Sequence, residues 1–260
     1  MSQFIDKLNQ ISQTVLQPMG FRAAQPASEK PRILLIASLA QANIDGLTER
    51  VAGADAGLLR IPGLSSVTKA LENVSQAVPE IPWGAWLEGI GKEEIEQIAK
   101  VSCDFMVFPP ASTSLAILKD DKVGKILEVE VSLSEGLLRA VNELPADAVL
   151  IADEHDGEYP LTWHHLMSVQ RCASLLAKPL LVTIPSNVST NELQALWEAG
   201  VNGIVVGVGA KEPVGRLREL RQVIEKLVFP SPRKRRKAEA LIPHISEETD
   251  DVTEIEEEEE

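Results

Sequence analysis

Short apolar runs and longer amphipathic segments alternate along most of the chain. The apolar runs have the length of buried strands, and the segments between them repeat their apolar residues with the period of a helix. Because strands that alternate with helices pair in parallel through right-handed crossovers, the pattern predicts an α/β fold with a parallel sheet. We predict strands at residues 33–37, 56–60, 84–87, 105–108, 126–131, 148–152, 180–184 and 204–208.

A repeated phrase indicates that this sheet closes on itself. A small residue, an acidic or amide residue and an apolar residue open every second strand, with the polar member at Asp55, Asp104, Asp147 and Asn202. This fourfold repetition favours a closed (β/α)8 barrel, the TIM barrel. The alternative is an open doubly wound sheet, which usually carries a glycine-rich turn after its first strand. Residues 38–41 contain no glycine, so we expect the closed barrel.

The barrel, which we place at residues 31–229, is flanked by two segments of different composition. Residues 1–30 begin with an apolar helical stripe and continue as a linker rich in proline and small residues. We expect this helix to cap the barrel floor, and the alternative is a helix that binds a partner. Residues 230–260 carry a basic block followed by an acidic run, which predicts a disordered tail. The stripe consists of Phe4, Leu8, Ile11 and Val15.

Charge and cysteine content restrict the class of protein. The net charge is −14, and the chain before the tail is itself acidic, so we expect no nucleic-acid partner for the barrel. Two cysteines, Cys103 and Cys172, cannot build a disulfide framework, which indicates a reducing cytoplasm. We find neither a signal-peptide pattern nor an apolar run of membrane-spanning length, and we predict a cytoplasmic protein without membrane insertion. The tail is the candidate for contacting a protein partner, and homo-oligomerisation stays open.

Charged residues gather at the C-terminal ends of the predicted strands, where barrels of this type carry their active sites. In the strand at 126–131, alternation turns Glu128 and Glu130 into the barrel, with Glu130 nearer the mouth and therefore the better functional candidate. Arg60 and Glu88 close the second and third strands. We expect Arg60 to pair with Glu130 or Glu88, or to clamp a carboxylate or phosphate ligand. The alternative role for Glu130 is a structural ion pair.

The loop after the sixth strand, residues 153–159, concentrates acid–base groups at the mouth. Asp153 is a candidate to hold Mg²⁺ or Mn²⁺ together with Glu130, and His155 is a candidate to transfer protons near neutral pH. The alternative is a solvated acidic turn without chemistry.

Glycines at the end of the eighth strand are the candidate cofactor contact. Gly207 and Gly209 would let backbone N–H groups approach a phosphate, although the loop at 185–188 after the seventh strand contains no glycine. The same incomplete phosphate site weakens flavin binding as a hypothesis. The predicted C-terminal strand ends contain no lysine, which disfavours a Schiff-base aldolase.

Two stretches resemble a known family. They are LEVEVSLSEGLLRAVNELPADAVLIADEHD at 127–156 and NELQALWEAGVNGIVVGVG at 191–209. Between Leu127 and Leu227 the chain resembles the second half of the metal-dependent, pyruvate-type aldolases related to the citrate lyase β chain. The resemblance implies that Glu130 and either Asp153 or Asp156 hold Mg²⁺, which binds an enolate. The chain departs from that family at Ser132, where members carry a carboxylate.

These observations support two hypotheses from different classes. The first is a small-molecule enzyme, specifically a metal-assisted carbon–carbon lyase that acts on a small anionic substrate. Its catalytic residues would be Arg60, Glu88, Glu130 and His155, with the cation on Glu130 and Asp153. The second is a catalytically inactive barrel that serves as a scaffold or ligand-binding protein, with partner contacts through its tail.

Overall fold

The computed structural model describes the barrel and its first helix. Its described residues are 2–13, 33–40, 46–60, 64–88, 91, 95, 97–98, 101, 103–152, 160–209 and 213–227. The chain divides into a unit of Met1–Val228 and a unit of Phe229–Glu260. The linker and the tail, which the sequence predicts at 14–30 and 230–260, lie outside the described residues, so the predicted disorder of the tail stays a prediction.

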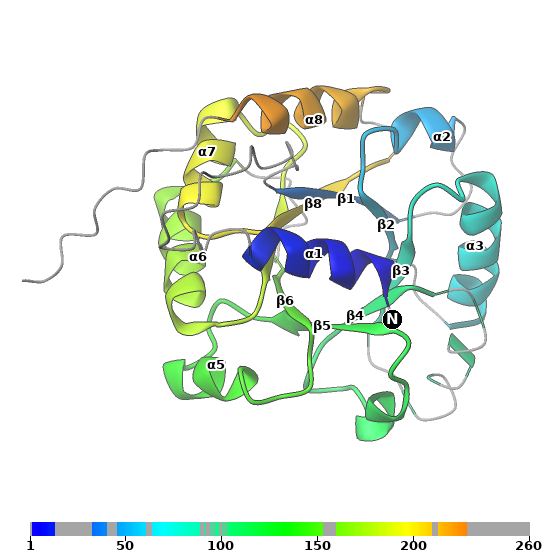
Figure 1. Cartoon of the computed structure of the whole chain (residues 1–260), viewed down its shortest axis with the longest axis horizontal. Helices are drawn as coiled ribbons and strands as arrows, with labels where there is room; N and C mark the ends of the chain where they lie inside the picture. The colour runs from blue at the N-terminus through cyan, green and yellow to red at the C-terminus, as the bar shows by residue number, and fades with distance from the viewer. Residues whose placement is uncertain are drawn as a thin grey trace, which may run out of the picture. The chain divides into compact units, whose positions relative to one another are not determined.

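Eight parallel strands in the described part of the chain close into a barrel (Figure 1). Each strand pairs with the next one in sequence, and β8 pairs with β1. This order confirms the closed barrel and is incompatible with the open doubly wound sheet. The strands are β1 Leu34–Leu39, β2 Ala56–Leu59, β3 Trp83–Trp86, β4 Phe105–Phe108, β5 Gly124–Val129, β6 Ala148–Ile151, β7 Leu180–Ile184 and β8 Gly203–Gly207.

One predicted strand boundary is wrong in a way that concerns the candidate site. The predicted strand at 126–131 starts two residues earlier, at Gly124, which pairs with Phe105, and it ends at Val129. Glu130 therefore lies beyond the strand, where its carbonyl oxygen accepts a hydrogen bond from Leu133 N at 3.2 Å. The turn closed by this bond removes Glu130 from the inward-facing alternation that the sequence pattern assigned to it.

Helices surround the barrel and begin where local sequence signals place them (Figure 1). The side chain of Ser189 accepts from Glu192 N while the Glu192 carboxylate accepts from Ser189 N, a capping box that starts α7. The side chain of Ser134 caps α5 by accepting from Leu137 N. None of the described helices has the length and apolarity that a membrane span requires. The outer elements are α2 Leu47–Arg50, α3 Leu64–Ala77, the 3₁₀ helix η1 Leu115–Lys119, α5 Glu135–Val141, α6 Trp163–Leu175, α7 Thr190–Glu198 and α8 Arg216–Lys226.

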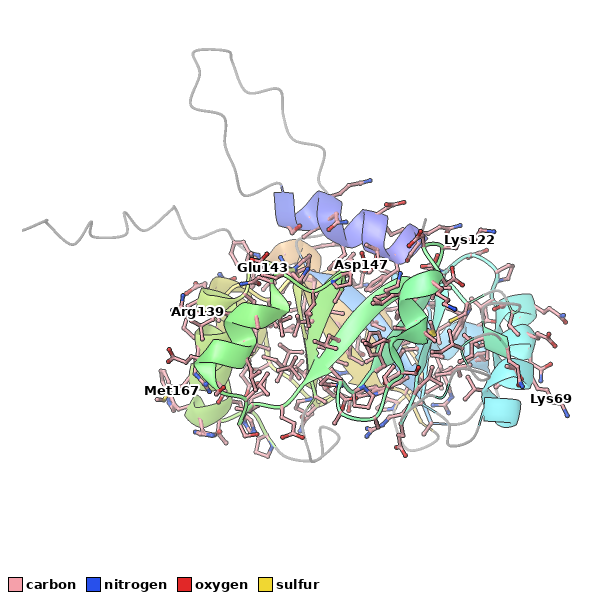
Figure 2. The ribbon with its side chains drawn as sticks, turned by 90° about the horizontal axis from the view of Figure 1, so that it is seen from below. Lys69, Lys122, Arg139, Glu143, Asp147 and Met167 are labelled. Atoms are coloured by element: carbon pink, nitrogen blue, oxygen red, sulfur yellow. The ribbon has the colours of Figure 1, made fainter. Side chains whose placement is uncertain are left out.

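The helix α1, Gln3–Gln13, lies across one end of the barrel (Figure 1). Its Phe4 and Leu8 side chains are completely buried and join the cluster formed by the inward faces of the strands. The Phe4 ring lies 4.5 Å from that of Phe105 on β4, measured between centroids. Figure 2 shows α1 over the end of the barrel that carries Lys122 and Asp147. The structure thus confirms that α1 caps the floor, and Val15 of the predicted stripe lies outside the described residues.

The repeated acidic or amide residues form hydrogen bonds at the floor of the barrel. Asp55, Asp147 and Asn202 each use a side-chain oxygen to accept from a backbone N–H near the start of the preceding strand, at 2.8, 2.7 and 2.9 Å. Asp55 also pairs with Arg221 of α8. These bonds satisfy N–H groups at the edge of the barrel, one residue before the ladder to the following strand begins. Asp104, the fourth member, binds α1 instead.

Candidate binding site at the C-terminal mouth of the barrel

The inward-facing residues change from apolar to polar near the C-terminal ends of the strands. Four residues at this level come from the odd-numbered strands, and each pairs with an apolar residue of the adjacent even-numbered strand. Layers of four side chains from alternate strands are the normal filling of such a barrel. The pairs are Ser38 with Leu58, Trp86 with Val107, Glu128 with Leu150, and Thr183 with Val205. We call Ser38, Trp86, Glu128 and Thr183 the mouth layer.

Trp86 joins a cation to an anion within this region. The guanidinium carbon of Arg60 lies 4.4 Å from the centroid of the Trp86 ring, and Trp86 Nε1 donates a hydrogen bond to Glu128 Oε2 at 2.8 Å. A guanidinium over an indole face contributes about 0.5–2 kcal/mol, and a hydrogen bond to a charged group about 1.5–3 kcal/mol. Trp86 is buried while Arg60 and Glu128 are half-buried. The indole therefore holds both charged groups at the mouth with restricted freedom.

Thr183 contributes a hydroxyl to the mouth layer on the opposite side. The residue is 9% exposed, and Oγ1 is buried without a hydrogen-bond partner among the described residues. A buried hydroxyl without a partner costs about 1–3 kcal/mol. An orphaned group of this kind in a mouth that carries charged residues is a candidate contact for a ligand.

The structure separates Glu128, in β5, from Glu130, which follows the strand. Glu128 faces the interior and contacts Trp86, whereas the exposed Glu130 accepts from Ser132 Oγ at 3.0 Å through its carboxylate. Glu88 is likewise exposed, directly after β3. Trp86 thus contacts both Arg60 and Glu128. The sequence instead predicted that Arg60 pairs with Glu130 or Glu88, or clamps an anionic ligand.

Two residues of the mouth layer, Trp86 and Thr183, were not candidates from the sequence, although a signal for each existed. Alternation in the predicted third strand put Trp86 on the same face as Glu88, and Thr183 is a polar residue within the otherwise apolar run LLVTI. Alternation alone places Thr183 inward, because Leu180, Val182 and Ile184 pack outward with the helices. Its lack of a partner becomes visible only in three dimensions.

The predicted metal centre lies partly outside the described residues. Asp153, Asp156 and His155 belong to the segment 153–159, which the structure does not describe. Within the described ranges no group of three histidine, cysteine, aspartate or glutamate side chains is arranged to hold a metal ion. The Mg²⁺ or Mn²⁺ site on Glu130 and Asp153 therefore stays a prediction.

Of the two glycines predicted to contact a phosphate, Gly207 has open space at its Cβ position. Gly207 ends β8 facing the interior, and no described atom lies within 4 Å of the position that a Cβ would take. The carbonyl oxygen of Gly209 accepts from Arg50 Nη1 at 2.7 Å. Residues 210–212, which lead toward α8, lie outside the described part, so binding of a phosphate-bearing cofactor at Gly207 and Gly209 stays a prediction.

Both cysteines are structural rather than reactive. Burial raises the pKa of the Cys103 thiol to about 12 and also raises that of Cys172. Because the thiolate is the nucleophile, neither residue is suited to thiol catalysis at neutral pH.

Comparison with known proteins finds similarity in fold. No protein-family model and no curated protein sequence matches the chain. A tryptophan synthase from M. tuberculosis in its aminoacrylate-bound form is 16% identical with a TM-score of 0.60, covering 86% of this chain and 99% of that one. A mutant tryptophan synthase α-subunit from Pyrococcus furiosus is 13% identical with a TM-score of 0.56, covering 75% and 97% of the two chains. A thiamine phosphate pyrophosphorylase from Pyrococcus furiosus is 15% identical with a TM-score of 0.58, covering 76% and 98%.

These similarities establish the TIM-barrel fold and nothing finer. The solved structures named here belong to enzymes, but identities this low do not transfer a reaction or a substrate. The resemblance of residues 127–227 to the citrate lyase β-chain family stays a prediction.

Proposed function

We propose that the chain is a small-molecule enzyme that binds an acidic substrate at the C-terminal mouth, with Arg60 as the anion partner and Glu128 as the proton-transfer group. The observation that carries the proposal is the Arg60–Trp86–Glu128 contact, which holds a guanidinium and a carboxylate on one indole. Enzymes with this fold place their active sites at this end of the barrel. Several structures with the same fold belong to enzymes, which agrees with this assignment.

The stacked position suits Arg60 to bind an anion. A guanidinium presents five N–H donors in its own plane, and stacking on an aromatic face does not use these donors. The half-buried position strengthens a hydrogen bond from these donors to an anion relative to bulk water. The nearby Arg60 cation also makes this part of the mouth more favourable for an anion than for a divalent cation.

The hydrogen bond from Trp86 suits Glu128 to proton transfer. It fixes Oε2 and thereby orients the carboxylate toward the mouth. A positioned carboxylate accelerates proton transfer by roughly a hundredfold to ten-thousandfold. In this proposal Glu128 takes the proton-transfer role for which His155 was the candidate from the sequence.

The reaction class that we propose is cleavage of a carbon–carbon bond, as the family resemblance implies. In a 4-hydroxy-2-oxo acid, Glu128 would take the proton of the 4-hydroxyl, and the C3–C4 bond would break as the C4 carbonyl forms. The electron pair of the broken C3–C4 bond would move onto C3 and the 2-oxo oxygen, which gives an enolate. Protonated Glu128 would then return the proton to C3. Arg60 would hold the carboxylate of the substrate throughout.

Isothermal titration of the full chain with malonate and inorganic phosphate tests the anion site. We expect Arg60→Met to weaken binding at least tenfold, because it removes the guanidinium but keeps an apolar stem over Trp86. Glu130→Gln is the matched control, since its carboxylate bonds within its own loop, and it should bind within twofold of wild type. Unchanged affinity in Arg60→Met would overturn the proposed anion site.

Pyruvate release from a panel of 4-hydroxy-2-oxo acids tests the chemistry. Glu128→Gln should lose turnover at least a hundredfold while it retains malonate binding, because the amide still accepts from Trp86 but does not take a proton. Binding that depends on Arg60 without turnover in wild type would instead support the non-catalytic ligand-binding alternative.

The divalent cation is tested separately. Mn²⁺ binding that Glu130→Gln abolishes would support a metal assigned to Glu130 and Asp153. Absence of Mn²⁺ binding would remove the metal from the proposal and leave the roles of Arg60 and Glu128 unchanged.

A further inference from the structure

We infer that the cleft between α1 and the floor of the barrel binds a small zwitterion, a free amino acid with an aliphatic side chain. The cleft has a volume of about 400 Å³ and lies between α1 and the turns that precede β5, β6 and β7. Pockets that bind small molecules measure about 300–1,000 Å³. Figure 2 shows Lys122 and Asp147, which line the cleft, at the end of the barrel that α1 covers. Arg60 and Glu128 lie at the opposite end, so the inference is independent of the proposed function.

Charges of both signs line this cleft in equal number. The salt bridges that the described residues form join none of these groups to one another, so their charges are not paired within the cleft. A ligand with a single charge would be attracted by one kind of group and repelled by the other, whereas a zwitterion complements both. The charged lining residues are Lys122, Lys125 and Lys178, and Asp6, Asp121 and Asp147.

Lys125 and Lys178 are the partners that we assign to the carboxylate of the ligand. Both contact the turn before β6. There Asp147 Oδ2 accepts from Lys125 N, and the carbonyl oxygen of the preceding residue accepts from Lys178 Nζ, each at 2.7 Å. Lys125 is 8% exposed, and its Nζ donates to the Asp120 carbonyl oxygen at 2.5 Å. An ammonium has three donors, so two remain at each lysine. A buried cation costs free energy unless an anion pairs with it, and a ligand carboxylate supplies that anion.

Asp6 of α1 and Asp121 of the turn before β5 are the partners that we assign to the ammonium of the ligand. Both line the cleft and are exposed, and neither carboxylate accepts a hydrogen bond from a described residue. Asp147 differs from them, because one of its oxygens already bonds to Lys125 N. Two carboxylates therefore remain for the positive group of the ligand.

An apolar part of the lining indicates the side chain of the ligand. Leu144 is a large apolar residue that is 47% exposed, and it lines the same cleft as the buried Ile5 of α1. An aliphatic ligand side chain would cover this surface, which favours binding through the hydrophobic effect. Because α1 supplies both Ile5 and Asp6, the bound ligand would also hold α1 against the floor.

Calorimetric titration of the full chain compares L-leucine with two analogues that each lack one charge. These are 4-methylpentanoate, which lacks the amino group, and 3-methylbutylamine, which lacks the carboxylate. We expect each analogue to bind at least about tenfold more weakly than leucine, because each loses one charge-assisted contact. Equal binding of leucine and either analogue would overturn the assignment of a zwitterion, and absence of leucine binding would overturn the site.

Two substitutions place the leucine in the cleft. Lys178→Met removes a carboxylate partner and Asp6→Asn removes an ammonium partner, and each should weaken leucine binding by about tenfold. The Asp6 side chain is exposed and bonds to no described residue, so Asp6→Asn should unfold at the wild-type temperature even if Lys178→Met folds poorly. Lys69→Met, at an exposed lysine of α3 outside the cleft, is the matched control and should bind within about twofold of wild type. Unchanged affinity in Asp6→Asn would overturn the inference.

Arg60→Met separates this site from the mouth. The variant should bind leucine as wild type does, because Arg60 lies at the other end of the barrel. Leucine binding that persists in Arg60→Met and weakens in Lys178→Met would support the floor site, whether or not malonate binds at the mouth. Loss of leucine binding in Arg60→Met would place the amino acid at the mouth and overturn the inference.

Discussion

The carboxylate oxygen Oδ2 of Asp104 lies 2.9 Å from the backbone nitrogen of Phe4, although the two residues are 100 positions apart in the chain. Asp104 also accepts from Gln3 N and from the Ser2 hydroxyl, both at 2.7 Å. A carboxylate at the first turn of a helix satisfies N–H groups that the helix leaves unpaired and complements its dipole. One member of a fourfold repeat thus fastens α1 to the barrel floor instead of bonding the preceding strand.

Replacement of Asp104 should loosen α1. We expect Asp104→Ala to lower the free energy of unfolding by about 1–2 kcal/mol, the usual cost of losing a helix cap. Urea denaturation followed by circular dichroism measures this change. Asp121→Ala, an exposed aspartate near the same end of the barrel, is the control and should change stability by less than about 0.5 kcal/mol. Equal effects of the two substitutions would contradict the capping role.

The hydrogen bond between Trp86 and Glu128 should appear as an energetic coupling. A double-mutant cycle of Trp86→Phe and Glu128→Met, measured by urea unfolding, should give a coupling free energy of about 1–2 kcal/mol because the bond is charge-assisted and half-buried. The control cycle pairs Trp86→Phe with Glu130→Met and should give a value near zero, since Glu130 bonds to Ser132. Similar coupling free energies in the two cycles would contradict a specific hydrogen bond between Trp86 and Glu128.

Alkaline pH should destabilise the fold through Cys103. Burial raises the pKa of its thiol from 9.0 to about 12, so the unfolded chain releases this proton at a lower pH than the folded chain does. The contribution to stability is complete below pH 9 and falls as the pH rises toward 12, by up to about 1.4 kcal/mol per pH unit. Urea unfolding of wild type and Cys103→Ala between pH 8 and roughly pH 10.5 measures the difference. Parallel pH dependences in the two proteins would contradict this cause.

Replacement of glycine by alanine should have opposite effects on stability at Gly84 and Gly136. A Cβ on Gly84 would lie 2.5 Å from the Phe105 ring inside the barrel, so Gly84→Ala should cost about 1–3 kcal/mol through overpacking. Gly136 in α5 has no described atom within 4 Å of the Cβ position and no positive φ, so Gly136→Ala should stabilise the protein by about 0.4–1 kcal/mol. Unfolding temperatures measure both changes, and a stable Gly84→Ala variant would show that the Phe105 ring can move aside.

Local patterns in the sequence determined most of the fold. Apolar runs located the strands to within two residues at their starts, and Ser134 and Ser189 marked helix starts, because periodicity and capping depend on neighbours in the chain. The stripe beginning at Phe4 and Leu8 identified a capping helix, since an amphipathic face must find an apolar surface. The repeat that includes Asp104 indicated closure, but not that Asp104 would bind α1.

The tertiary structure alone decided the candidate site. The sequence favoured Glu130 over Glu128, and the turn that follows Val129 reversed that order because it ended the inward alternation. The bond from Trp86 to Glu128 joins residues 42 positions apart, and the orphaned Oγ1 of Thr183 is defined by what surrounds it. Such relationships depend on which strands face each other once the barrel has closed. The periodicity of neighbouring residues in the sequence does not contain this information.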